Sequence, residues 1–440
     1  MTENQCRHPR EAAGGGPLAG IRVLEYAQYV AGPLATMLLA DLGADVIKVE
    51  PPAGDAWRNY APIVPGESLA FYGLNRNKRS VVLDLKAPEG RNLSRRLIAT
   101  ADAVVHNMPP DRATRFGLDR ESVRRTNARA VWSYVSAFGS DGPDASGLGY
   151  DLIAQAVSGL LTADVREGDA VPRRSGGIPM ADVTAGILTC AGVLAGLLGR
   201  ANAEAPGIEV SLLGAALVTQ AQKVPSLLSA VASEPSTGGV THADLEAMSS
   251  ELAQAEQLEP YYRCYETSDG YIALACLNLT QRRQVLELLG LSDPWAPNPQ
   301  AAPFDENERA ARGSYHGLFA ARFRERSSIE WLTTLRDRGV PAAQVRDLDR
   351  ALESQQVYAN GLVQSVDQAG IGPVRLLGNL FKLDGHAAPA RRPAPRLGEH
   401  DHEVLGPLTV DLPSLVSEPP LQRPPARGPR GDADAVLPPC

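Results

Sequence analysis

The stretch IRVLEYAQYVAGPLATMLLADLGADVIKVE, residues 21–50, determines the predicted fold. Its apolar runs Ile21–Glu25 and Asp45–Glu50 are typical of short buried strands. A helix is predicted from Pro33 to Leu42, because proline favours the first turn of a helix and Gly43 provides a C-cap. A strand, a helix and a strand within about thirty residues have the size of a right-handed βαβ crossover.

The same alternation continues beyond residue 50. Further strands are predicted over 80–84, 103–106 and 131–136, with a helix over 88–100. Strands that alternate with helices favour a parallel sheet covered by helices on both faces, so we expect an α/β fold. The turn after the first strand lacks the G-x-G-x-x-G pattern, so no dinucleotide site is expected there.

A change in pattern after residue 258 indicates a second, smaller α+β domain. Two strand-like runs flank Ser268-Asp-Gly270, which is typical of a hairpin, and Ser327 with Glu330 predicts a capping box at the start of a helix. The full predicted organisation is a flexible leader (1–16), a large domain (17–225), a connector (226–258), a small α+β domain (259–340), a segment of strands and loops (341–407) and a disordered proline-rich tail (408–440).

Composition excludes several classes of protein. The chain has 440 residues and a net charge of -8, which provides no basic face for nucleic acid. Its five cysteines include no C-x-x-C pair, so we expect neither a disulfide framework nor a metal site, and reduced thiols favour a cytoplasmic location. The uncharged run Val183–Gly199 is shorter than the ~20 apolar residues of a membrane span, so a core helix is predicted and no membrane partner.

Asp182 is the candidate catalytic residue of highest interest. It stands in Ile178-Pro-Met-Ala-Asp-Val-Thr-Ala-Gly186, where a helix is expected to begin. The unpaired N–H groups and the positive end of a helix favour an ionised, well-oriented carboxylate, which is a plausible nucleophile. The alternative is that Asp182 only caps its own helix, since aspartate is a preferred N-cap residue.

Seven segments in one order resemble the class III acyl-CoA transferases, the CaiB/BaiF family, which also contains the α-methylacyl-CoA racemases. The segments are Leu18-Ala-Gly-Ile-Arg-Val-Leu-Glu25, Ala31-Gly-Pro33, Leu39-Ala-Asp-Leu-Gly-Ala-Asp-Val-Ile-Lys-Val-Glu-Pro51, Asn75-Arg-Asn-Lys-Arg-Ser80, Asp84-Leu-Lys-Ala-Pro-Glu-Gly90, Pro260-Tyr-Tyr-Arg-Cys-Tyr-Glu-Thr-Ser-Asp-Gly270 and Pro395-Arg-Leu-Gly-Glu-His400. The nucleophilic aspartate of the family opens an Asp-x-x-x-Gly element, and Asp182-Val-Thr-Ala-Gly186 matches it.

The resemblance implies a CoA-transferase that moves CoA from an acyl-CoA to a free carboxylic acid through Asp182. A mixed anhydride and then an aspartyl-CoA thioester are the implied intermediates, so that one hard exchange is split into easier steps. The resemblance also implies that residues 17–225 form a Rossmann-like, CoA-binding large domain to which residues 341–407 return. It further implies an interlocked homodimer, with Glu266 of one chain brought towards Asp182 of the other.

The positions that contact coenzyme A in the family are also implied by resemblance. They fall on Val30, Ala31, Leu83, Lys86, Asn107, Arg115 and Tyr150. Arg115 would pair with the diphosphate, because charge-assisted hydrogen bonds hold phosphates strongly. For Lys86 and Arg115 taken singly, a solvated helix face is the alternative.

A racemase is the main alternative function. Racemases of this family use a histidine directly before an aspartate, with a glutamate in the hairpin, whereas this chain has Tyr150, Asp151 and Glu266. A tyrosine with a pKa near ~10 is a poor base at neutral pH, so transfer is favoured, although Asp151 and Glu266 keep a proton-transfer role open. A non-catalytic acyl-CoA-binding protein is a third alternative.

Two departures from the family concern the substrate. Pro51 stands where some members place an arginine against the adenine, and the glycine-rich loop of formyl-transferase-like members is missing before the hairpin. The missing loop argues against oxalate or formate as substrate.

Overall fold

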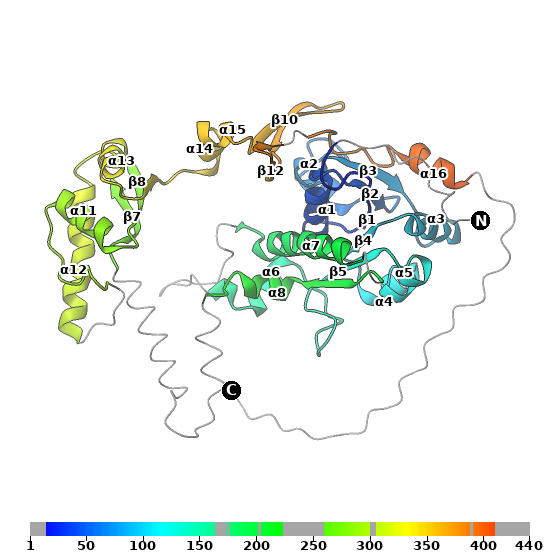
Figure 1. Cartoon of the computed structure of the whole chain (residues 1–440), viewed down its shortest axis with the longest axis horizontal. Helices are drawn as coiled ribbons and strands as arrows, with labels where there is room; N and C mark the ends of the chain where they lie inside the picture. Colours follow the sequence, from blue (N-terminus) through cyan, green and yellow to red (C-terminus); the bar gives the residue numbers. More distant parts are fainter. Residues whose placement is uncertain are drawn as a thin grey trace, which may run out of the picture.

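The structure, a computed structural model, describes most of the chain. The described residues are 15–162, 174, 177–200, 204–222, 259–299, 305–387 and 390–409. The predicted connector, 226–258, lies outside them, as do positions 1–14 of the predicted leader and 410–440 of the predicted tail. Figure 1 shows a large domain built around one sheet and a small domain held apart from it.

The large domain contains a six-stranded, wholly parallel sheet in the order β3-β2-β1-β4-β5-β6. The strands are β1 (Arg22–Tyr26), β2 (Asp45–Glu50), β3 (Lys78–Val82), β4 (Ala103–His106), β5 (Val131–Ser136) and β6 (Gly207–Ser211). This is the strand order of a doubly wound fold, and the order reverses between β1 and β4. The predicted Rossmann-like α/β class is therefore confirmed, and the crevice at the reversal is where such folds bind ligands.

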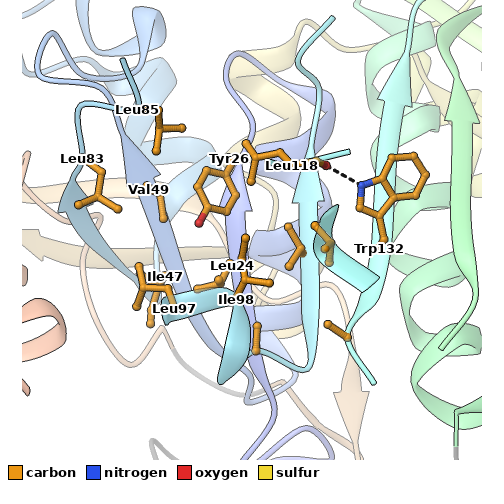
Figure 2. Close-up of a cluster of buried hydrophobic side chains, with 14 of the residues drawn as sticks. Leu24, Tyr26, Ile47, Val49, Leu83, Leu85, Leu97, Ile98, Leu118 and Trp132 are labelled. Atoms are coloured by element: carbon orange, nitrogen blue, oxygen red, sulfur yellow. Dashed lines mark hydrogen bonds between the residues drawn. The ribbon is translucent and has the colours of Figure 1, made fainter. Parts of the chain in front are cut away.

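Helices cover both faces of this sheet (Figure 1). One face packs on α1 (Ala31–Asp41) and α7 (Met180–Gly199). The other packs on α3 (Pro88–Ala99), α4 (Pro110–Phe116), α5 (Arg120–Thr126) and α16 (Asp401–Thr409). Successive strand residues point to opposite faces, so Val23 joins the first core and Leu24 the second. Figure 2 shows the second core, where the Trp132 indole donates to the Leu118 carbonyl at 2.8 Å.

Predicted and observed elements differ most where polar residues are buried. The strands predicted at 45–50, 103–106 and 131–136 are β2, β4 and β5, but β3 begins two residues before the predicted strand at 80–84. The extra residues include Lys78, which is fully buried because Glu25 pairs with it. An apolar pattern cannot indicate such a strand start. The edge strand β6 was not predicted.

Helix α7 approaches the sheet and α1 closely through its glycines. A Cβ at Gly186 would lie 2.9 Å from the Ala31 carbonyl oxygen, and one at Gly196 would lie 2.7 Å from a Val131 methyl group. In the described part of the chain, α7 is the helix whose length and apolar composition would allow a membrane span. Its packing against the sheet agrees with the predicted core helix.

Two short helices flank α7 and complete the site region. Helix α6 (Asp151–Val157) is followed by a 3-10 turn, η2 (Leu160–Thr162), and α8 (Leu212–Val218) follows β6. Their buried alanines and Leu212 pack on the first turns of α7 and on Ala31 of α1. The start of α7 is thus enclosed by α1, α6 and α8.

The small domain has its own core. Its antiparallel sheet is β7 (Tyr262–Thr267), β8 (Gly270–Ala275) and β9 (Ala342–Gln344), and its helices are α11 (Leu279–Leu289), α12 (Glu306–Phe323) and α13 (Ser328–Asp337). Aromatic residues dominate this core, including Tyr265, Phe319, Phe323 and Trp331. The capping box predicted at Ser327 and Glu330 is present at the start of α13.

After β9 the chain returns to the large domain. The return contains α14 (Leu348–Leu352), α15 (Gln355–Ala359), the hairpin β10 (Val363–Gln368) and β11 (Gly372–Leu377), and the short pair β12 (Lys382–Leu383) and β13 (His386–Ala387). It then binds β3, where the Ser80 carbonyl accepts from His400 N at 3.0 Å and Val82 N donates to Asp401 at 2.8 Å. The carboxyl-terminal segment therefore closes the free edge of the sheet at β3.

Replacement of Gly186 by alanine should destabilise the protein, because the new methyl group would meet the Ala31 carbonyl and the Leu34 side chain. We expect a loss of about 1–3 kcal/mol in the free energy of unfolding, measured by denaturant titration. Gly199→Ala is the matched control, since nothing lies within 4 Å of a Cβ there. Relative to glycine, alanine stabilises a helix by up to about 1 kcal/mol, so Gly199→Ala should not destabilise the protein. Equal losses of stability at the two positions would contradict the close packing at Gly186.

Candidate active site

Asp182 lies in the first turn of α7, three positions after the N-cap residue Pro179. The alternative that Asp182 caps its own helix is therefore wrong. Proline has no side-chain oxygen, so the first amides of α7 need an acceptor from elsewhere in the chain. The Asp182 carboxylate accepts no hydrogen bond from the residues that the structure describes.

Asp151 supplies the missing acceptor. Its Oδ1 accepts hydrogen bonds from Ala181 N at 2.9 Å and from Asp182 N at 3.2 Å. Its Oδ2 accepts from Gln155 Nε2 at 2.7 Å and lies 3.6 Å from the Arg174 guanidinium. Asp151 is buried, at 5% exposure, so the predicted acid pair consists of one engaged carboxylate and one free carboxylate.

The protonation of Asp182 differs from the prediction. Burial raises the pKa of Asp182 to about 7, the like charge of Asp151 acts in the same direction, and Arg174 opposes both. We predicted that the helix start would keep this group ionised, whereas a pKa of about 7 leaves it only partly ionised near neutral pH. The amides that would have stabilised its charge are bound to Asp151 instead, so burial outweighs the helix dipole.

Tyr150 lies beside this pair, at the N-cap of α6, with 62% of its surface exposed. Its ring meets the ring of Tyr29 edge to face, with centroids 5.5 Å apart. The hydrogen bond with Tyr150 raises the pKa of Tyr29, and burial adds to the effect. The structure thus brings Asp151 to Asp182, with Tyr150 directly before Asp151 at the start of α6.

Tyr29 and Trp57 belong to the site region but were not predicted. Tyr29 has a φ of 69°, which is uncommon for a residue with a side chain, and its ring also packs on Trp57 at 5.8 Å. Trp57 stacks in turn on Tyr60 at 4.3 Å. Trp57 lies after β2 in the turn η1 (Ala56–Asn59), and Tyr60 is the C-cap residue of that turn, so sequence spacing gave no signal that Trp57 meets Tyr29.

Glu266 lies elsewhere within this chain. It is on β7 in the small domain, where it pairs with Arg324 at 2.7 Å. Figure 1 shows β7 far from α7. Within one chain, the structure does not bring Glu266 to Asp182.

The positions predicted to contact coenzyme A lie along the carboxyl edge of the sheet. Val30 and Ala31 begin α1, Leu83 follows β3, and Asn107 follows β4. The Asn107 side chain accepts from Gln28 N at 3.1 Å and donates to Gln28 O at 2.9 Å, which ties together the two loops at the strand-order reversal. Asn107 thus shapes the crevice through its own side chain.

Two exposed cations complete this predicted set. Lys86 follows β3, and Arg115 lies in the last turn of α4, where its guanidinium is 5.7 Å from the Phe116 ring. Neither forms an ion pair with any described residue. Both are therefore available to an anionic ligand.

A buried charge cluster, which the sequence did not indicate, underlies the loop that precedes α1. Glu25, Lys48, Lys78 and Asp55 are all fully buried. Lys48 Nζ lies 2.7 Å from Glu25 and 2.8 Å from Asp55, and Lys78 Nζ lies 2.8 Å from Glu25. Burial alone would raise the pKa of Glu25, but the two lysines lower it to about 2.

This charge cluster also fixes the backbone of the loop. Lys48 donates to the Ala27 carbonyl at 2.9 Å, and Lys78 donates to the Pro33 carbonyl at 2.8 Å. The loop that carries Val30 and Ala31 is therefore held at both ends by buried ammonium groups.

The raised pKa of Asp182 makes folding sensitive to pH. The ordinary pKa of an aspartate is 3.8, and between this pH and about 7 the folded chain binds the proton of Asp182 more strongly than the unfolded chain does. The contribution of Asp182 to the free energy of unfolding therefore falls as pH rises through this range. Asp182→Asn should therefore raise the free energy of unfolding at pH 8 and have little effect at pH 4. Denaturant titration at both pH values tests this, and an equal effect at both would contradict it.

Comparison with known proteins agrees with this geometry. The model of CoA-transferase family III matches residues 18–401. The chain is 33% identical over 426 residues to a succinate–glutarate CoA-transferase of Agrobacterium fabrum, which covers 93% of this chain and 98% of that protein. It is 29% identical to an acetyl-CoA:oxalate CoA-transferase of Acetobacter aceti, over 91% of this chain and 96% of that protein.

A solved structure shows the same fold. The crystal structure of a CaiB/BaiF family protein from Brucella suis superposes with a TM-score of 0.71 and 28% sequence identity, over 90% of this chain and 100% of that one. The resemblance seen in the seven sequence segments is thereby confirmed. The chain belongs to CoA-transferase family III, and it is a CoA-transferase.

Proposed function

We propose that this enzyme moves CoA from an acyl-CoA to a free carboxylate through a covalent intermediate on Asp182. The observation that carries the proposal is the state of the Asp182 side chain. It stands in the first turn of α7, free of hydrogen bonds to the described residues, while Asp151 binds the helix amides. A carboxylate with no hydrogen-bond partner among the described residues is suited to act as a nucleophile.

The steps balance without a net proton transfer. A carboxylate oxygen of Asp182 attacks the thioester carbonyl carbon, the C–S bond breaks, and the CoA thiolate leaves a mixed anhydride. The thiolate attacks the aspartyl carbonyl, which releases the donor acid and forms an aspartyl-CoA thioester. The acceptor carboxylate attacks this thioester to form a second anhydride, and the thiolate then takes the acceptor acyl group and restores Asp182.

This sequence requires CoA to stay bound while its thiolate is free. The carboxyl edge of the sheet provides a suitable place, because the uncapped start of α1 offers amides at Val30 and Ala31. Lys86 and Arg115 offer exposed positive charges for the phosphates, and the Tyr150 ring contacts Tyr29 in the loop before α1. We propose that these residues, with Leu83 and Asn107, form the CoA site.

Short dicarboxylic acids are the proposed acyl groups, because the two similar enzymes above are named for succinate, glutarate and oxalate. Succinyl-CoA with glutarate is the first pair to test, since the enzyme named for those acids shares more of this sequence. The argument against oxalate from the missing glycine-rich loop stays a prediction.

Asp182→Ala should abolish CoA exchange, because no other described side chain at the start of α7 offers a free carboxylate. We expect the wild-type enzyme to give an aspartyl hydroxamate at this position when it is incubated with succinyl-CoA and hydroxylamine, measured by mass spectrometry of peptides. The variant should give none. Exchange that survives the substitution would refute the proposed carrier.

Mass spectrometry of the acyl-CoA products also separates transfer from the alternative functions. A racemase would introduce solvent deuterium at the α-carbon with no change in the acid that carries CoA. Asp151 is a poor candidate for that proton transfer, since both of its oxygens already accept hydrogen bonds. Binding of CoA by calorimetry, without turnover on any acyl-CoA, would instead favour a non-catalytic acyl-CoA-binding protein.

We also propose a cytoplasmic homodimer in which the chains interlock. Large apolar side chains are exposed on three neighbouring helices, and a soluble monomer rarely leaves such a patch uncovered. They are Leu152, Ile153 and Val157 on α6, Ile187, Leu188 and Leu198 on α7, and Leu217 and Val218 on α8. The separate position of the small domain (Figure 1) leaves room for a second chain, whose Glu266 would then approach Asp182.

Light scattering should give twice the mass of the chain, and the dimer should persist on dilution because interlocked chains cannot separate without unfolding. Size-exclusion chromatography across a hundredfold dilution provides an independent check. A monomer in both measurements would contradict the proposed assembly.

A further inference from the structure

The start of α7 is capped by a residue of another helix. Asp151 Oδ1 accepts from the amides of Ala181 and Asp182 at 2.9 and 3.2 Å. The N-cap residue Pro179 has no oxygen to offer in its side chain. Without Asp151, the amides of a buried residue, Ala181, and a half-buried one, Asp182, would lose this acceptor.

Asp151 is itself held in place. Gln155, one turn further along α6, donates from Nε2 to Asp151 Oδ2 at 2.7 Å and to the Ile178 carbonyl at 3.2 Å. Arg174 lies 3.6 Å from the same carboxylate oxygen. The Gln155 amide therefore joins α6 to the chain just before Pro179, while Asp151 joins α6 to the chain just after it.

We propose that Asp151 is a positioning residue for acyl transfer, because its carboxylate occupies the amides of α7 and so leaves the side chain of Asp182 free to react. This inference rests on the proposed function of Asp182. It assigns Asp151 no contact with the substrate. The two acids of the predicted site then have different roles: Asp151 caps α7, and Asp182 carries the acyl group.

The negative charge of Asp151 adds a second effect that can be measured. Burial raises the pKa of Asp182 to about 7, with Asp151 as the next cause and Arg174 acting against both. No other titratable group in the described chain contributes to this shift. Because the carboxylate is the reactive species, kcat/KM should rise with pH through a limb near 7.

Asp151→Asn separates the charge from the hydrogen bonds. The Asn oxygen can still accept from Ala181 N and Asp182 N. Its amide can donate to Gln155 Oε1, which is buried and has no partner in the described chain, if the Gln155 amide turns over. The variant should therefore fold, while Asp182 loses a neighbouring like charge.

We expect the limb of kcat/KM in Asp151→Asn to move to lower pH by roughly one unit. Asp151→Ala removes the acceptor as well, so it should show the same displacement, a lower melting temperature and at least a tenfold lower kcat. Asp349→Asn on α14 removes one exposed carboxylate far from α7 and is the matched control. Its limb and its melting temperature should equal those of the wild type.

Two results would overturn the inference. In the first, the folded Asp151→Asn enzyme shows the rise of kcat/KM at the same pH as the wild type. In the second, the kcat of Asp151→Ala equals that of the wild type. Exchange in Asp182→Ala would instead show that the proposed carrier is wrong, so the two failures are distinguishable. Melting temperatures of all variants show whether any loss of rate follows from unfolding.

Discussion

The pairing of Glu25 with Lys48 and Lys78 in the core of the large domain is the interaction on which the site depends. Asp55 balances the second positive charge, so two carboxylates and two ammonium groups are buried together. A buried charge that loses its partner costs roughly 3–5 kcal/mol, so the four groups must be present together. They join the first three strands to the loop before α1, and that loop begins the crevice at the strand-order reversal.

Close packing then extends this constraint to α7, the helix that contains Asp182. Gly186 lets α7 rest on the Ala31 carbonyl at the start of α1, and Gly196 lets it rest on β5. Asp182 lies one turn before Gly186, so its position relative to α1 follows from that contact. The glycine of the Asp-x-x-x-Gly element is thus needed for the close contact between α7 and α1. That contact in turn sets the position of the aspartate.

The pKa of Asp182 reflects a balance between the helix start and the burial of the side chain. A helix start favours a negative charge by about 0.3–1 kcal/mol, which is small compared with the cost of desolvating a carboxylate. Here the helix amides are bound to Asp151, and burial raises the pKa of Asp182 to about 7. A carboxylate of higher basicity is a stronger nucleophile, so the arrangement suits an acyl carrier that must attack and later be restored.

The sequence by itself determined the α/β class, three of the strands to the residue, the family, and Asp182 as the residue of interest. Local apolar periodicity and short motifs carry that information, because neighbouring residues decide strands, helix starts and tight turns. Only the tertiary structure decided which acid caps α7, why β3 begins at a buried lysine, and that Tyr29 meets Tyr150 and Trp57. Those features depend on burial and on partners far apart in the chain, and burial is also what raises the pKa of Asp182.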